Sequence, residues 1–136
     1  MRSTIRLGIT CFVLLSVILA AAPGQSQKKK PAPKSSKPIS YTKDIVPVMK
    51  TYCLPCHTED AMNPSRLYLD TYEGLTAGGK HGPAIVTGKP DSSLLVRKIS
   101  EAPPFGDPMP MKRKAPFPAD TLGLLRSWIL QGAKNN

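Results

Sequence analysis

A five-residue motif, Cys-Leu-Pro-Cys-His at positions 53–57, restricts the fold of this chain more than any other feature. Cys53, Cys56 and His57 stand at positions i, i+3 and i+4, so on a helical turn all three side chains point to one face. That spacing allows the two thiols to form thioethers with the two vinyl groups along one side of a haem. The imidazole would then lie under the iron as an axial ligand. The pattern predicts covalent attachment of one c-type haem.

Three other uses of the two thiols are less consistent with the sequence. A thioredoxin-like redox pair needs a strand and helix context that the flanking residues do not provide. A zinc site lacks ligands, because His81 is the only other histidine and adjacent Cys56 and His57 fit a tetrahedron poorly. A disulfide would close a very short loop, which stabilises little, and would leave His57 without a role.

The N-terminus has the order of regions that is typical of a secretory signal peptide. Arg2 and Arg6 precede an apolar run from Leu7 to Ala22, which is followed by Pro23-Gly24. Residues 1–24 are therefore predicted to be a signal peptide or, because the run approaches the length of a membrane span, an uncleaved anchor. We expect a periplasmic or otherwise exported protein. Export agrees with the haem interpretation, since bacterial c-type haems are attached outside the cytoplasm.

Residues 25–40 contain five lysines, three prolines and few apolar side chains. Such a segment cannot offset its chain entropy by burial, so we predict a disordered tether. The formal net charge of the chain is +10, but residues 41–136 hold twelve Lys or Arg against nine Asp or Glu. A basic tail on an exported chain gives no reason to expect a nucleic-acid partner.

Residues 41–136 are predicted to form one all-α domain of three to five short helices wrapped around a single covalently bound haem. A first helix over 41–52 is indicated by an apolar stripe that includes Ile45 and Met49. A last helix over 119–133 is indicated by a second stripe: Leu122, Leu125, Trp128 and Ile129.

Two further short helices are predicted between these. Asp70 and Glu73 have the spacing of a capping box, and Gly78-Gly79 would end the helix that they open. Asp91 is the expected N-cap of another helix, whose Leu94, Leu95 and Ile99 would face inward.

A proline-rich stretch, residues 103–118, has six prolines in sixteen residues, so neither helix nor sheet can run through it. Met109 lies in this loop between two prolines, which limit how far its thioether can move. A methionine held in this way suits the sixth coordination position of a haem iron, and Met109 is the predicted ligand. Met111 and His81 remain alternatives, whereas Met62 is too near His57 in sequence to reach the opposite face.

Several stretches together resemble the planctomycete-type cytochrome c domain, a single-haem relative of the class I cytochromes c. They are CLPCH, residues 67–99, the Met109-Pro110 pair and residues 124–133. The resemblance covers nearly all of residues 41–136. It implies that Cys53 and Cys56 carry haem c, that His57 is the proximal ligand and that Met109 is the methionine of the family's Met-Pro pair. The chain departs from the family's usual residues at His81 and Pro118.

The expected function is electron transfer by an exported carrier, not enzymatic catalysis, because a His/Met-ligated iron has no open position. Redox partner proteins are expected, and Lys112-Arg113-Lys114 would attract an acidic docking surface. Membrane association through the N-terminus is a further expectation. The alternatives are a haem subunit of an oxidoreductase, or a ligand-sensing or peroxidatic haem protein with a displaceable sixth ligand.

Overall fold

The computed structural model describes residues 37–136. The predicted signal peptide or anchor, residues 1–24, and most of the predicted tether lie outside the described residues. Within residues 37–136, the chain forms four short α-helices, two shorter helical turns and no sheet, which confirms the all-α fold class. No helix in this part of the chain has both the length and the hydropathy of a membrane span.

The first predicted helix is confirmed as two consecutive pieces. A π-helical turn, η1 (Tyr41–Ile45), continues directly into α1 (Val46–Tyr52). Pro47 stands in the first turn of α1, where the missing amide hydrogen would have no helical partner. Ile45 and Met49 are almost completely buried, as the apolar stripe predicts. The helix ends immediately before Cys53, so α1 positions the cysteine motif.

Helix α2 (Tyr72–Ala77) begins one residue later than the capping-box prediction. The N-cap is Thr71, whose side-chain oxygen accepts the N–H of Gly74 at 3.0 Å, whereas Asp70 is exposed. The Asp70 assignment is therefore wrong, because the hydroxyl of Thr71 occupies the capping position. The predicted end is confirmed at Gly78, which has φ 77°. A Cβ at Gly78 would lie 2.6 Å from the carbonyl oxygen of Gly82, so only glycine fits.

The third helix also begins later than predicted. A 3-10 turn, η2 (Pro90–Ser92), precedes α3 (Leu94–Ile99), and Ser93 takes the N-cap position. Asp91 is therefore not the N-cap, because η2 displaces the helix start. Its carboxylate instead pairs with Arg126 of the last helix, α4 (Ala119–Leu130), at 2.5 Å. The fully buried Ser93 hydroxyl donates to the carbonyl of Lys89 and accepts the N–H of Val86.

The inward faces of the last two helices follow the predicted stripes except at Leu94 and Leu122, which are only partly buried. In α3, Leu95 and Ile99 are buried as predicted, but Val96 and not Leu94 is the third buried residue. Helix α4 (Ala119–Leu130) buries Leu125, Trp128 and Ile129.

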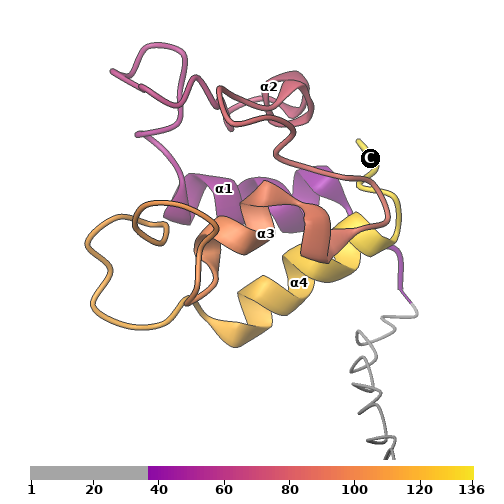
Figure 1. The fold of residues 1–136 in the computed structure, drawn as a ribbon. Helices are drawn as coiled ribbons and strands as arrows, with labels where there is room; N and C mark the ends of the chain where they lie inside the picture. The colour runs from indigo at the N-terminus through magenta and orange to yellow at the C-terminus, as the bar shows by residue number, and fades with distance from the viewer. Residues whose placement is uncertain (1–36) are drawn as a thin grey trace, which may run out of the picture.

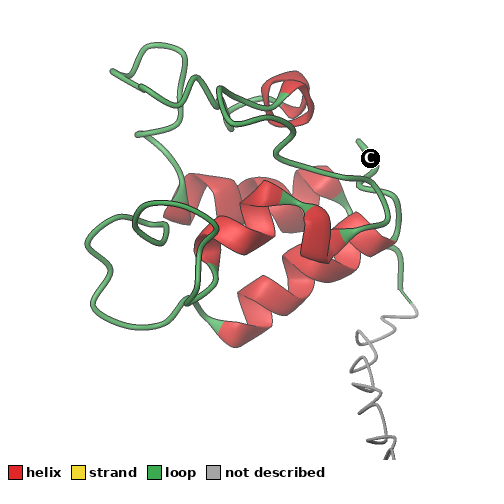
Figure 2. Cartoon of the chain, viewed as in Figure 1, coloured by secondary structure: helices red, strands yellow, loops and turns green. Residues whose placement is uncertain are grey.

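The helices surround one core, and α4 contacts η1, η2 and α3. Helix α2 lies apart from the other helices, beyond α1 (Figure 1). The ring of Tyr41 stacks on Trp128 at 5.7 Å and meets Tyr72 edge-on at 5.1 Å, so aromatic contacts join the first, second and last helices. The loop that follows α1 and the loop that joins α3 to α4 both project on the left-hand side (Figure 2).

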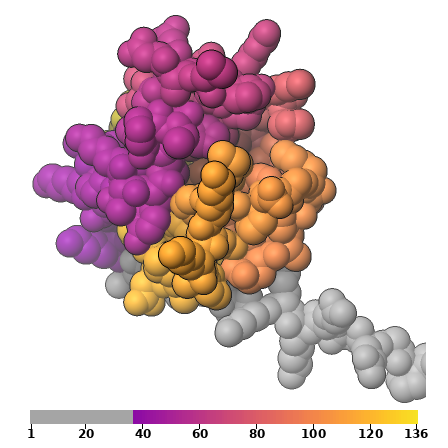
Figure 3. All heavy atoms as spheres, turned by 90° about the vertical axis from the view of Figure 1, so that its left-hand side faces the viewer, coloured from indigo at the N-terminus to yellow at the C-terminus, as the bar shows by residue number. Residues whose placement is uncertain are grey.

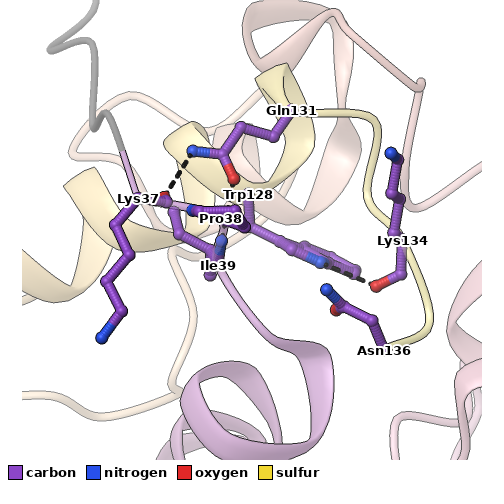
Figure 4. Close-up of a pocket in the computed structure, with 7 residues that line it drawn as sticks. All are labelled: Lys37, Pro38, Ile39, Trp128, Gln131, Lys134 and Asn136. Carbon is purple, nitrogen blue, oxygen red and sulfur yellow. Dashed lines mark hydrogen bonds between the residues drawn. The ribbon is translucent and has the colours of Figure 1, made fainter.

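A pocket of about 320 Å³ lies where residues 37–39, the end of α4 and residues 134–136 meet (Figure 4). Several of its polar groups have hydrogen-bond partners within the domain. The Gln131 side chain accepts the N–H of Ile39 and donates to the carbonyl of Lys37, while the indole of Trp128 donates to the carbonyl of Lys134. The pocket is lined by residues 37–39, which precede η1, whereas Cys53 follows the C-terminal end of α1.

Candidate functional site

The two cysteines of the motif differ in environment. Cys53 follows α1 directly, donates its backbone N–H to the carbonyl of Met49 at 2.9 Å and is partly buried. Its thiol lies 3.7 Å from the sulfur of Met49, and burial raises the pKa of this thiol from 9.0 to about 11. Cys56 is exposed, and neither cysteine forms a disulfide. Both thiols are therefore available to form thioethers.

The imidazole of His57 is oriented by a main-chain carbonyl. Its Nδ1 lies 3.0 Å from the carbonyl oxygen of Leu67, and its backbone N–H donates to the carbonyl of Cys53 at 3.2 Å. A carbonyl oxygen can only accept, so Nδ1 carries the proton, and in the neutral imidazole Nε2 then keeps its lone pair. This is how an imidazole that binds a metal through Nε2 is usually held.

The loop that carries the Leu67 carbonyl folds back on itself through Asn63, which sequence reasoning missed. The Asn63 side chain donates to the same Leu67 oxygen at 2.6 Å and accepts from the N–H and the hydroxyl of Ser65 at 3.2 and 2.6 Å. The backbone N–H of Leu69 donates to the carbonyl of His57 at 2.8 Å. The Asn63-Pro64 pair was an available turn signal, although it does not reveal the contact with Leu67.

The loop of Met109 lies on the same face of the molecule as the cysteine motif (Figure 3). The side chains of Met109 and Cys53 are both partly buried and pack against the same hydrophobic core. The rings of Tyr52 and Phe117 lie 4.9 Å apart, which joins the residue before Cys53 to the end of the proline-rich loop. The structure therefore brings the two predicted halves of the site to one face.

The other sulfur and nitrogen candidates for the sixth position have different surroundings. Met111 is 61% exposed and Met62 is 99% exposed. His81 is exposed, and its ring packs on that of Phe105 with 4.3 Å between centroids. Among the four candidates, only Met109 packs against the core.

These residues fit a c-type haem by the chemistry of their donor set. Two thiols follow a helix end, an imidazole has its Nε2 lone pair available, and a partly buried thioether lies in the loop that joins α3 to α4. Within residues 37–136, no group of three or more His, Cys, Asp or Glu side chains could hold a metal ion. In this part of the chain, a zinc site therefore lacks a set of ligands.

Comparison with known proteins identifies one family. Residues 53–110 match the family model described as planctomycete cytochrome C. The matched segment begins at Cys53 and ends at Pro110, so it includes both cysteines, His57 and Met109. Neither a search of curated proteins nor a search of solved structures found a match. The small, mostly helical architecture without a sheet is consistent with a cytochrome c domain.

Proposed function

We propose that this chain, which carries a planctomycete cytochrome C domain over residues 53–110, is a single-haem c-type cytochrome that transfers electrons. Cys53 and Cys56 would hold the haem covalently, and His57 and Met109 would bind its iron. The observation that carries the proposal is the hydrogen bond from His57 Nδ1 to the Leu67 carbonyl. It leaves Nε2 available for iron, and the two cysteines that precede His57 in the sequence form no disulfide.

The bound haem would supply one-electron chemistry between ferrous and ferric iron. The residues of this chain would set where that equilibrium lies. The carbonyl of Leu67 makes the His57 imidazole a stronger donor, which favours ferric iron. The thioether of Met109 favours ferrous iron relative to a second histidine, so it raises the reduction potential. His57 and Met109 together would leave no position on the iron for oxygen or peroxide, which favours electron transfer as the function.

Export and docking belong to the same proposal. The signal-like segment at residues 1–24 supports a periplasmic location, or attachment to the membrane through that segment. Lys112 and Lys114 are exposed and could attract an acidic redox partner at low ionic strength. Arg113 contributes less to such a surface, because its side chain is only 12% exposed.

Absorption spectra of the purified protein test the cofactor and the ligands. We expect a haem that remains attached after denaturation, and a ferric spectrum with the long-wavelength charge-transfer band of methionine ligation. Replacing both Cys53 and Cys56 by alanine should abolish covalent haem. A wild-type protein without haem would refute the proposed function.

Variants at two methionines test the sixth ligand. Met109→Ala should lose the charge-transfer band and lower the potential, while Met111→Ala serves as the matched control because its side chain is mostly exposed. If Met109→Ala kept the band and Met111→Ala lost it, Met111 would be the ligand. Rapid and tight binding of cyanide or peroxide by the ferric wild-type protein would instead favour a sensing or peroxidatic haem protein.

A further inference from the structure

The C-terminal end of α3 holds the loop of Met109. The last carbonyls of a helix have no helical partner and carry the negative end of its dipole. Here the Lys98 carbonyl accepts the N–H of Met109 at 2.7 Å. The guanidinium of Arg113 donates to the carbonyls of Ile99 and Ser100 at 2.8 and 3.1 Å. Two residues of the loop therefore satisfy three successive carbonyls at this helix end.

The side chain of Lys98 holds the loop on the N-terminal side of Met109. Its ammonium donates to the carbonyls of Phe105 and Asp107 at 2.7 and 2.6 Å. It also lies 4.6 Å from the centroid of the Phe105 ring, and His81 packs on the same ring. Lys98 thus contacts the loop through both its ammonium and its backbone carbonyl.

Arg113 holds the loop on the C-terminal side of Met109. Besides the two helix-end carbonyls, its guanidinium pairs with the carboxylate of Glu101 at 2.7 Å. The Arg113 side chain is 12% exposed, whereas that of Glu101 is 68% exposed. The hydrogen bonds from Arg113 to the carbonyls of Ile99 and Ser100 are therefore less exposed to solvent than the carboxylate of Glu101.

We propose that Lys98 and Arg113 are positioning residues that hold Met109 in place and so control access of external ligands to the sixth position of the iron. This inference rests on the proposed His57 and Met109 ligation. Residues 103–118 contain no helix or strand that could fix Met109 before α4 begins. The two cations on either side of Met109 therefore set how often its thioether leaves the iron. An external ligand binds only to the fraction of molecules in which the Met109 thioether has left the iron. Its apparent affinity therefore measures how firmly Lys98 and Arg113 hold the loop.

The test uses the holoprotein and imidazole as the probe ligand. Lys98→Met replaces the ammonium-bearing chain by an uncharged thioether chain of similar length, and Arg113→Lys removes the planar fork. Arg97→Met is the matched control, because Arg97 is an exposed cation on the same helix with no hydrogen bond or ion pair from its guanidinium among residues 37–136. It corrects for the loss of one positive charge near the haem.

We expect ferric Lys98→Met to bind imidazole about tenfold more tightly than Arg97→Met, because loss of a charge-assisted hydrogen bond changes an equilibrium by about that factor. The methionine charge-transfer band should weaken, and the backbone N–H of Met109 should exchange faster with deuterium. Arg113→Lys should change these quantities in the same direction. If Lys98→Met does not fold, Arg113→Lys provides the same comparison from the other side of Met109.

The outcomes separate the positioning role of Lys98 and Arg113 from the binding of iron by Met109. If the wild-type band is present, but Lys98→Met matches Arg97→Met and Arg113→Lys matches the wild type in imidazole affinity and in Met109 exchange, the positioning role is wrong and the ligation stands. If the wild-type protein lacks the methionine band, the ligation is wrong, and the positioning role fails with it. Hydrogen exchange at the Met109 amide measures directly how firmly the loop is held, and it does not depend on electron-transfer activity.

Discussion

Replacing Asn63 by alanine tests whether the loop beneath His57 is held by side-chain hydrogen bonds. The substitution removes one donor to the Leu67 carbonyl, at 2.6 Å, and one acceptor for the N–H and hydroxyl of Ser65, at 3.2 and 2.6 Å. Each such bond contributes about 1 kcal/mol net. Because these groups are only partly buried, water replaces some of what is lost. We expect the free energy of unfolding to fall by about 2 kcal/mol.

For a domain of this size, that loss corresponds to a decrease in Tm of about 10 °C. Differential scanning calorimetry of the holoprotein measures it, with Met62→Ala as the control in the same loop. Met62 is 99% exposed, so its truncation should change the free energy of unfolding by less than about 0.5 kcal/mol. The reduction potential should also shift in Asn63→Ala, because the Leu67 carbonyl that holds His57 becomes less fixed. If the two variants had the same Tm and potential, this account of the His57 loop would be refuted.

Two further predictions concern backbone space and pH. Gly123→Ala in α4 should stabilise the domain by about 0.5–1 kcal/mol, since a Cβ there meets nothing within 4 Å. Gly79→Ala should destabilise the domain, since a Cβ there would lie 2.7 Å from the Ser65 carbonyl oxygen. Urea unfolding of both variants measures the two changes in the free energy of unfolding. In haem-free protein, burial raises the pKa of Cys53 from 9.0 to about 11, so between these values the unfolded chain has lost a proton that the folded chain keeps. The free energy of unfolding should therefore decrease as pH rises from about 9 to about 11, more steeply than in Cys53→Ala, and equal slopes in the two proteins would contradict the effect of burial on this thiol.

The helices could be predicted from the sequence, but two of their starting points could not. Apolar side chains repeat with the helical period around Ile45 and Trp128, and both residues are buried as expected. The choice between Asp70 and Thr71 as N-cap was not decided by residue type, because both side chains suit that position. Only the path of the backbone places the hydroxyl of Thr71 against the N–H of Gly74.

The contacts that orient the candidate iron ligands could not be predicted from the sequence, for a related reason. The cysteine motif made Cys53, Cys56 and His57 candidates because its spacing is itself the chemical signal. The partner of His57 is a main-chain carbonyl ten residues away, and every residue has such a carbonyl. The same holds for the Lys98 carbonyl that accepts the N–H of Met109.

Both proposed iron ligands are held in the same way, on loops whose anchors are main-chain oxygens. His57 donates to the carbonyl of Leu67, and Met109 donates its N–H to the carbonyl of Lys98. A substitution cannot delete a carbonyl, so neither acceptor depends directly on the identity of its own side chain. What substitutions can change is the position of each oxygen, which Asn63 fixes on the histidine side and the end of α3 fixes on the methionine side. The reduction potential should therefore change more when residues that shape the two loops are replaced than when Leu67 is replaced by another apolar residue. At Leu67 the main-chain carbonyl, and not the side chain, contacts His57.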